Sequence, residues 1–129
     1  MTEIRGPALI LDEGLSLWGG MDPATGSLID THHPQHGASL TGRVVVMPSG
    51  RGSSSSASVL AEAVRAKTAP AAFILEQADL ILAIGAAVAF ELYGVLVPVV
   101  VLVPDARALV TDGAELIVTA DGSVRLADL

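Results

Sequence analysis

Short runs of apolar residues alternate along the chain with segments of helical periodicity, and this order predicts an α/β fold. Continuous apolar runs at 44–47 and 71–75 are typical of buried strands. Between them, residues 54–67 carry apolar side chains at helical spacing, with charged side chains on the other side. A strand, a helix and a second strand of this size predict a βαβ unit, and therefore a sheet that is at least partly parallel.

The rest of the pattern extends this centre on both sides. A second helix is predicted over 80–92, followed by a strongly hydrophobic strand over 97–103. Further short strands are predicted at 8–11, 28–29, 115–119 and 123–125, with Asp121 and Gly122 in the turn between the last two. We therefore expect an α/β fold in one domain over residues 1–129, with a partly parallel central sheet flanked by helices and extra strands.

Composition and charge restrict what this fold can do. Seven basic and fourteen acidic residues give a net charge of -7, which disfavours nucleic acid and anionic membrane surfaces as partners. The uncharged runs within 71–104 are shorter than the roughly 18 residues of a membrane span. The N-terminus lacks a secretory signal pattern, so we expect a cytoplasmic protein. With no cysteine, the chain cannot supply thiolate ligands to a metal cluster.

Candidate chemistry is concentrated in residues 48–56, Pro-Ser-Gly-Arg-Gly-Ser-Ser-Ser-Ser, which we call the serine loop. It joins a predicted strand to a helix N-terminus, where backbone N–H groups are unpaired and carry partial positive charge. Ser53, Ser54 and Ser55 can therefore offer amide and hydroxyl donors to an anion. Arg51 adds a planar cation suited to a carboxylate or phosphate. The spacing fits neither a Walker A loop nor a dinucleotide fingerprint, which disfavours an ATPase or a dehydrogenase.

The residues alone leave a structural interpretation of this loop open. Gly50 and Gly52 could serve only the turn, one serine could cap the helix, and the other serines could be surface residues. Elsewhere, a cap for the second helix is the expected role of Asp79, and close helix packing is the expected role of Gly85.

Several motifs in a fixed order add a resemblance to a known family. They are residues 15–26 (Leu-Ser-Leu-Trp-Gly-Gly-Met-Asp-Pro-Ala-Thr-Gly), Ile29-Asp30 with His33-Pro34, the serine loop, and residues 68–72 (Thr-Ala-Pro-Ala-Ala). Together they resemble the small swivel domain of the aconitase X family, from about residue 8 to 102. Members of that family are single fused chains or two subunits, and this chain resembles the small subunit of the split form.

The resemblance implies a swivelling β/β/α fold and a hydro-lyase that dehydrates a 3-hydroxy carboxylate. The chain would act only with a large partner subunit that holds an iron–sulfur cluster or iron, while binding no cofactor itself. Ser53 would be the proton acceptor, and Arg51, Gly52, Ser54 and Ser55 would bind the substrate. The arginine precedes the serines here, whereas it follows them in the Gly-Ser-Ser-Arg loop of the broader aconitase superfamily.

Two substrates are associated with the family. Mevalonate 5-phosphate belongs to an archaeal isoprenoid route, and cis-3-hydroxy-L-proline to bacterial hydroxyproline catabolism. We favour mevalonate 5-phosphate because the split form suits it. Two other functions stay open, a non-catalytic phosphate- or carboxylate-binding module and a phosphocarrier-like domain, although no histidine is well placed for the second.

The three histidines and the tryptophan complete the candidate residues. His32, His33 and His36 lack a fourth ligand at a suitable spacing, so we expect a loop at the subunit interface and no metal site in this chain. Trp18 is expected to pack, either against the partner or at the edge of the core.

Overall fold

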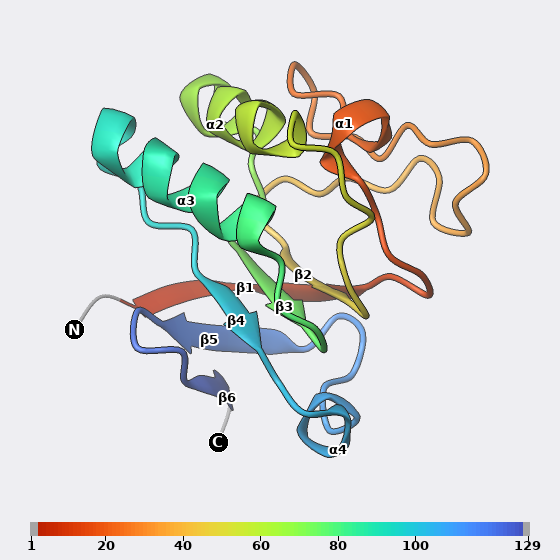
Figure 1. The fold of residues 1–129 in the computed structure, drawn as a ribbon. Coiled ribbons are helices and arrows are strands. Elements are labelled where there is room, and N and C mark those ends of the chain that lie inside the picture. The colour runs from red at the N-terminus through yellow and green to blue at the C-terminus, as the bar shows by residue number, and fades with distance from the viewer. Residues whose placement is uncertain (1–2, 128–129) are drawn as a thin grey trace.

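The computed structural model describes residues 3–127, which form a six-stranded mixed sheet with two main helices on one face (Figure 1). The strand order is β4-β3-β2-β1-β5-β6. The elements, in chain order, are β1 (Glu3–Ile10), α1 (Leu17–Gly20), β2 (Val44–Met47), α2 (Ser56–Ala66), β3 (Ala72–Leu75), α3 (Leu80–Tyr93), β4 (Val99–Val101), α4 (Pro104–Arg107), β5 (Glu115–Thr119) and β6 (Val124–Leu126).

The first four strands of the chain are parallel to one another, as the βαβ pattern predicts. Val45 pairs with Leu9 on one side and Phe73 on the other, so β2 is a central strand. Its apolar run is continuous because both faces of the sheet are covered: Val45 and Met47 belong to one core cluster, Val44 and Val46 to another.

Helices α2 and α3 lie side by side on the same face of the sheet (Figure 1). The close approach requires Gly85, because a Cβ there would lie 2.9 Å from the Cα of Ala57. The predicted cap is also present, since the Asp79 side chain accepts a hydrogen bond from the backbone N–H of Leu82 at 3.0 Å. Both sequence predictions for these residues are confirmed.

The C-terminal part of the chain adds the antiparallel half of the sheet. β5 pairs with β1 and β6 pairs with β5, both antiparallel, and the predicted hairpin turns at Asp121 and Gly122. On the face opposite α2 and α3, a smaller apolar cluster forms between sheet residues and Val110, which follows α4.

Some boundaries predicted from the sequence are wrong. Residues 28–29 form no strand of their own, because Leu28 makes only an isolated bridge to Met21 within the long connection between α1 and β2. β4 is limited to three residues, since Pro98 lacks the N–H needed for ladder pairing and Pro104 starts α4. β1 starts earlier than expected, at Glu3, because residues 3–7 pair with β5. The α/β class with a partly parallel sheet is confirmed.

Among residues 3–127, no helix combines the length and apolar character needed to cross a membrane.

Candidate functional site

Three connections meet where the parallel strands end, and the serine loop is one of them (Figure 1). Ligands of open α/β sheets commonly bind beyond the carboxyl ends of such strands. Gly14, which follows β1, lies so close to the serine loop that a Cβ on it would be 2.3 Å from the carbonyl oxygen of Ser49. Gly50 contacts the connection after β3, where a Cβ would be 1.9 Å from Oδ2 of Asp79. Two glycines therefore allow the three connections to approach one another.

The serine loop turns sharply before α2 begins. Gly52 has φ +85° and Ser53 has φ +68°, so two successive residues have left-handed backbone conformations. This conformation is ordinary for glycine but costs a residue with a side chain about 1 kcal/mol. The helix begins at Ser56 and not at Ser54 as predicted, and Ser55 occupies the N-cap position without making a side-chain cap bond.

A buried serine, Ser56, holds the turn in place through hydrogen bonds. Ser56 is 3% exposed, and its Oγ donates to the carbonyl oxygen of Gly52 at 3.1 Å while accepting from the backbone N–H of Trp18 at 3.2 Å. Ser16 Oγ lies 3.1 Å from the same Gly52 carbonyl and 3.3 Å from Ser56 Oγ. The serine loop is therefore attached to the segment that starts α1.

The donors above this network are free within the described part of the chain. Neither the backbone N–H groups nor the hydroxyl groups of Ser53, Ser54 and Ser55 donate a hydrogen bond to any residue of 3–127. Ser53 and Ser54 are exposed and Ser55 is half-buried. They stand at the N-terminus of an 11-residue helix with no acidic residue in its first turn, where the helix dipole favours an anion.

Arg51 precedes these donors in the chain, and its side chain contacts Glu13. Its Nη2 is 3.3 Å from Oε1 of Glu13, and both side chains are about half exposed. A single contact of this kind leaves other guanidinium N–H groups available to a ligand. The predicted cation is therefore adjacent to the free amides in the chain, and its guanidinium lies against Glu13.

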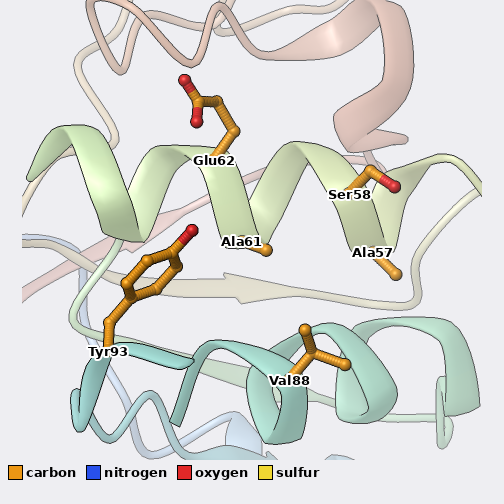
Figure 2. A pocket seen from close by; sticks show the side chains of 6 residues that line it. All are labelled: Ala57, Ser58, Ala61, Glu62, Val88 and Tyr93. Atoms are coloured by element: carbon orange, nitrogen blue, oxygen red, sulfur yellow. The ribbon is translucent and has the colours of Figure 1, made fainter. Parts of the chain in front are cut away.

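A shallow groove elsewhere on the surface does not include the serine loop. It runs between α2 and α3 and is lined by Ala57, Ser58, Ala61, Glu62, Val88 and Tyr93. Figure 2 shows the Tyr93 hydroxyl pointing across it towards α2. The hydrogen bond from Arg65 to the Glu62 carboxylate lowers the pKa of Glu62, so this acid is already paired. The groove therefore offers apolar surface, the hydroxyl groups of Ser58 and Tyr93, and an acid that is already paired with Arg65.

The histidines do not assemble a metal site. Among residues 3–127, no group of three or more His, Cys, Asp or Glu side chains could hold a metal ion. His32 and His36 are exposed, whereas His33 is 3% exposed and bonded to the backbone on both sides. The donor set of the described chain therefore does not fit an iron or iron–sulfur centre.

A model of the family described as "Aconitase X swivel domain" matches residues 2–126. The chain belongs to this family. The resemblance stated from the sequence motifs is thereby confirmed, and the loop geometry above is that of an aconitase X swivel domain.

The relatives and solved structures agree with this assignment. The cis-3-hydroxy-L-proline dehydratase of Pseudomonas aeruginosa is 47% identical over 97 residues, which are 75% of this chain and 17% of that protein. The phosphomevalonate dehydratase small subunit of Methanothrix thermoacetophila is 34% identical, over 95% of this chain and 90% of that subunit. The crystal structure of Thermococcus kodakaraensis aconitase X (holo-form) matches with a TM-score of 0.84 at 29% identity, over 97% of this chain and 90% of that chain.

The two groups of relatives differ in how much of each protein is matched. This swivel domain spans less than a fifth of the two cis-3-hydroxy-L-proline dehydratases that it matches. In contrast, it spans 61–90% of four phosphomevalonate dehydratase small subunits, from Methanothermobacter thermautotrophicus, Methanopyrus kandleri, Methanothrix thermoacetophila and Methanocella arvoryzae.

The sequence-predicted residues are consecutive in the chain, and the structure leaves Arg51, Gly52, Ser53 and Ser54 exposed and Ser55 half-buried. Trp18 does not fill the edge of the core, because 61% of it is exposed. Sequence reasoning missed Glu13 and Gly14, and it named Ser16 and Ser56 only as members of motifs, without their role in supporting the loop. The carboxyl end of the first predicted strand could have indicated Glu13 and Gly14, since loops after parallel strands converge.

Proposed function

We propose that this chain is the small subunit of a cytoplasmic aconitase X-type hydro-lyase, which removes water from a 3-hydroxy carboxylate with Ser53 as the proton acceptor. The observation that carries the proposal is the set of unpaired donors at the α2 N-terminus, with Ser53 in a left-handed conformation at its tip. Strained backbone at a non-glycine residue is typical of functional sites.

The binding step uses the free donors of the serine loop. The substrate carboxylate or phosphate would receive N–H bonds from Ser54 and Ser55 and a charge-assisted bond from Arg51. A Cβ added to Gly52 would meet no atom within 4 Å, so the backbone there is open to a ligand. An anion bound in this way lies against the positive end of the α2 dipole.

The proton step is assigned to the Ser53 side chain. Its Oγ, as the conjugate base, takes the proton from the carbon next to the carboxylate, and the C–H electron pair forms the new C=C bond. The hydroxyl group on the next carbon departs with its bonding pair as hydroxide and takes the proton from Ser53, so that one water is lost and the Ser53 base is restored. A serine hydroxyl is a weak base at neutral pH, so Arg51 and the adjacent amides must stabilise its deprotonated form in a site closed to water.

We propose that the closure comes from a large partner subunit. Ser53 and Ser54 are exposed in this chain, and the relatives include subunits named small and much longer single chains. The iron or iron–sulfur cluster expected of the family would belong to that partner, and no step assigned to this chain passes through it. The isolated chain is expected to be inactive.

Mevalonate 5-phosphate is the first substrate that we propose. The match to a phosphomevalonate dehydratase small subunit extends over 95% of this chain and 90% of that subunit, which supports this choice. The second candidate is cis-3-hydroxy-L-proline, favoured by the higher identity of 47% to the Pseudomonas aeruginosa enzyme.

Anaerobic reconstitution with the large subunit tests the proposal. Water loss from both substrates is measured for the wild type, Ser53→Ala and Ser58→Ala, the last an exposed serine in the first turn of α2. We expect turnover of one substrate, at least ~10²-fold lower in Ser53→Ala and unchanged in Ser58→Ala, because a lost proton acceptor typically costs 10²–10⁴-fold.

Two results would contradict the proposal. Full turnover by Ser53→Ala would exclude Ser53 as the proton acceptor. No turnover with either substrate in a stable, iron-loaded complex would instead favour the non-catalytic binding module, in which Ser53→Ala weakens anion affinity only.

A further inference from the structure

We propose that His33 is a positioning residue, which holds Arg51 in place for the substrate by fixing Glu13. This inference rests on the proposed role of Arg51 in substrate binding. His33 lies in the turn of residues 30–37, which we call the histidine loop and which the catalytic proposal does not use.

The hydrogen bonds of His33 define its protonation. Its Nδ1 is 3.0 Å from the backbone nitrogen of Gln35, and its Nε2 is 3.0 Å from the carbonyl oxygen of Glu13. A backbone N–H can only donate and a carbonyl can only accept, so Nδ1 is the acceptor and Nε2 carries the proton. His33 is thus a neutral imidazole with one tautomer and both ring nitrogens bonded.

Residues 12–14 are held between the histidine loop and the serine loop. On one side, Glu13 is fixed by His33, and the backbone N–H of Asp12 donates to Oε1 of Gln35 at 3.1 Å. On the other side, Gly14 is packed against Ser49, and the Glu13 carboxylate contacts Arg51 at 3.3 Å. The path from the buried ring to the guanidinium therefore has two contacts, His33 to Glu13 and Glu13 to Arg51.

Burying the imidazole of His33 has a free-energy cost. At 3% exposure His33 gives up hydration of two polar nitrogens, which an apolar side chain of similar size would not require. The bonds recover that cost only in one arrangement of Glu13. We infer that the His33 ring orients Glu13 as well as filling space. If Glu13 were mobile, the half-exposed Arg51 side chain would lose its fixed orientation.

Two substitutions separate the bond to Glu13 from the local turn. In His33→Gln, the side-chain amide can reach Glu13 and donate to its carbonyl. In His33→Asn, the shorter side chain can accept from the Gln35 N–H but cannot reach Glu13. Ser58→Ala and Asp105→Asn are the controls, since both side chains are exposed and lie outside the serine and histidine loops.

The experiment measures kcat and KM of the reconstituted complex with whichever of the two substrates is turned over, at matched amounts of folded complex. We expect about a tenfold higher KM for His33→Asn with kcat much less affected, because Arg51 contributes to binding. His33→Gln should recover most of the loss, and both controls should match the wild type. Combined with Arg51→Ala, His33→Asn should add no further increase, since it acts through Arg51.

Each outcome has one interpretation. If Arg51→Ala raises KM but His33→Asn behaves like the controls, or if the two effects are additive, the positioning role is wrong and the substrate-binding proposal stands. If Arg51→Ala leaves KM unchanged, both the role of Arg51 and this inference are overturned. Should His33→Asn fail to fold, a KM for the folded His33→Gln complex equal to that of an apolar His33→Leu complex would also overturn it.

Discussion

The serine loop and the turn of the terminal hairpin are both short, polar, glycine-containing segments. They differ in whether their polar groups are hydrogen-bonded within the chain. In the hairpin turn, the Thr119 hydroxyl donates to the Asp121 carboxylate, which also accepts from the backbone N–H of Ser123 at 3.1 Å. The backbone N–H of Gly122 donates to the Thr119 carbonyl at 3.0 Å. In the serine loop, the donors of Ser53 to Ser55 have no partner among residues 3–127.

The contrast separates a turn that serves folding from a turn that presents donors. A turn that only reverses the chain gains stability by satisfying its own polar groups. In the serine loop, the Gly52 carbonyl accepts hydrogen bonds from Ser16 and Ser56, whereas the donors of Ser53 to Ser55 stay unpaired within residues 3–127. Composition alone does not distinguish the two, because both are rich in small polar residues.

The largest effect is expected from the glycine that supports the serine loop. Gly14→Ala places a Cβ 2.3 Å from a backbone oxygen that cannot move without displacing the loop, so we expect a loss of about 3 kcal/mol in unfolding free energy. Gly122→Ala in the hairpin turn meets no atom within 4 Å and suffers only from φ +93°, for a loss of about 1 kcal/mol. Urea unfolding of the full chain compares them, and equal losses would contradict the prediction.

An intermediate effect is expected at Ser56. Ser56→Ala leaves the backbone N–H of Trp18 unpaired and removes one donor from the Gly52 carbonyl, which should lower the unfolding free energy by about 2 kcal/mol. Turnover of the complex should fall as well, because the loop loses its attachment. Ser58→Ala, on the exposed side of the same helix, should stay within about 0.5 kcal/mol of wild type in the same urea titration. A neutral Ser56→Ala would show that the attachment is unimportant.

The smallest effect is expected from the hairpin turn and depends on pH. Hydrogen bonds from the Thr119 hydroxyl and then from the Ser123 backbone lower the pKa of Asp121 below its usual 3.8. A lowered folded-state pKa gives stability that is present above the unfolded pKa and is lost as pH falls through the folded pKa. Wild type should therefore be slightly more stable than Asp121→Asn at neutral pH, and the difference should shrink below about pH 3.8. Thermal unfolding across pH 2 to 7 measures it, and a pH-independent difference would contradict this origin.

The sequence is informative where a segment carries its own signal. The valine run of β2 predicts a strand because both of its faces are buried, and the Pro, Gly and Ser punctuation after it predicts the serine loop. Asp79 and Asp121 also follow local rules for helix caps and turns, and both were predicted correctly. These features depend on neighbours within a few residues.

The rest depends on partners far away in the chain. Residues 3–7 have no strand pattern and become part of β1 only because β5 pairs with them. The contacts of Glu13 join positions 20 and 38 residues apart, to His33 and Arg51, and no local pattern indicates them. The left-handed backbone of Ser53 could not be predicted from the sequence either, because serine has no preference for that conformation.

That backbone at Ser53 has an evolutionary consequence. Glycine adopts the left-handed conformation at a lower free-energy cost than serine does, so replacing Ser53 by glycine would remove strain from the folded state. Selection for stability alone would therefore favour glycine at position 53. We expect selection for turnover to keep serine there instead.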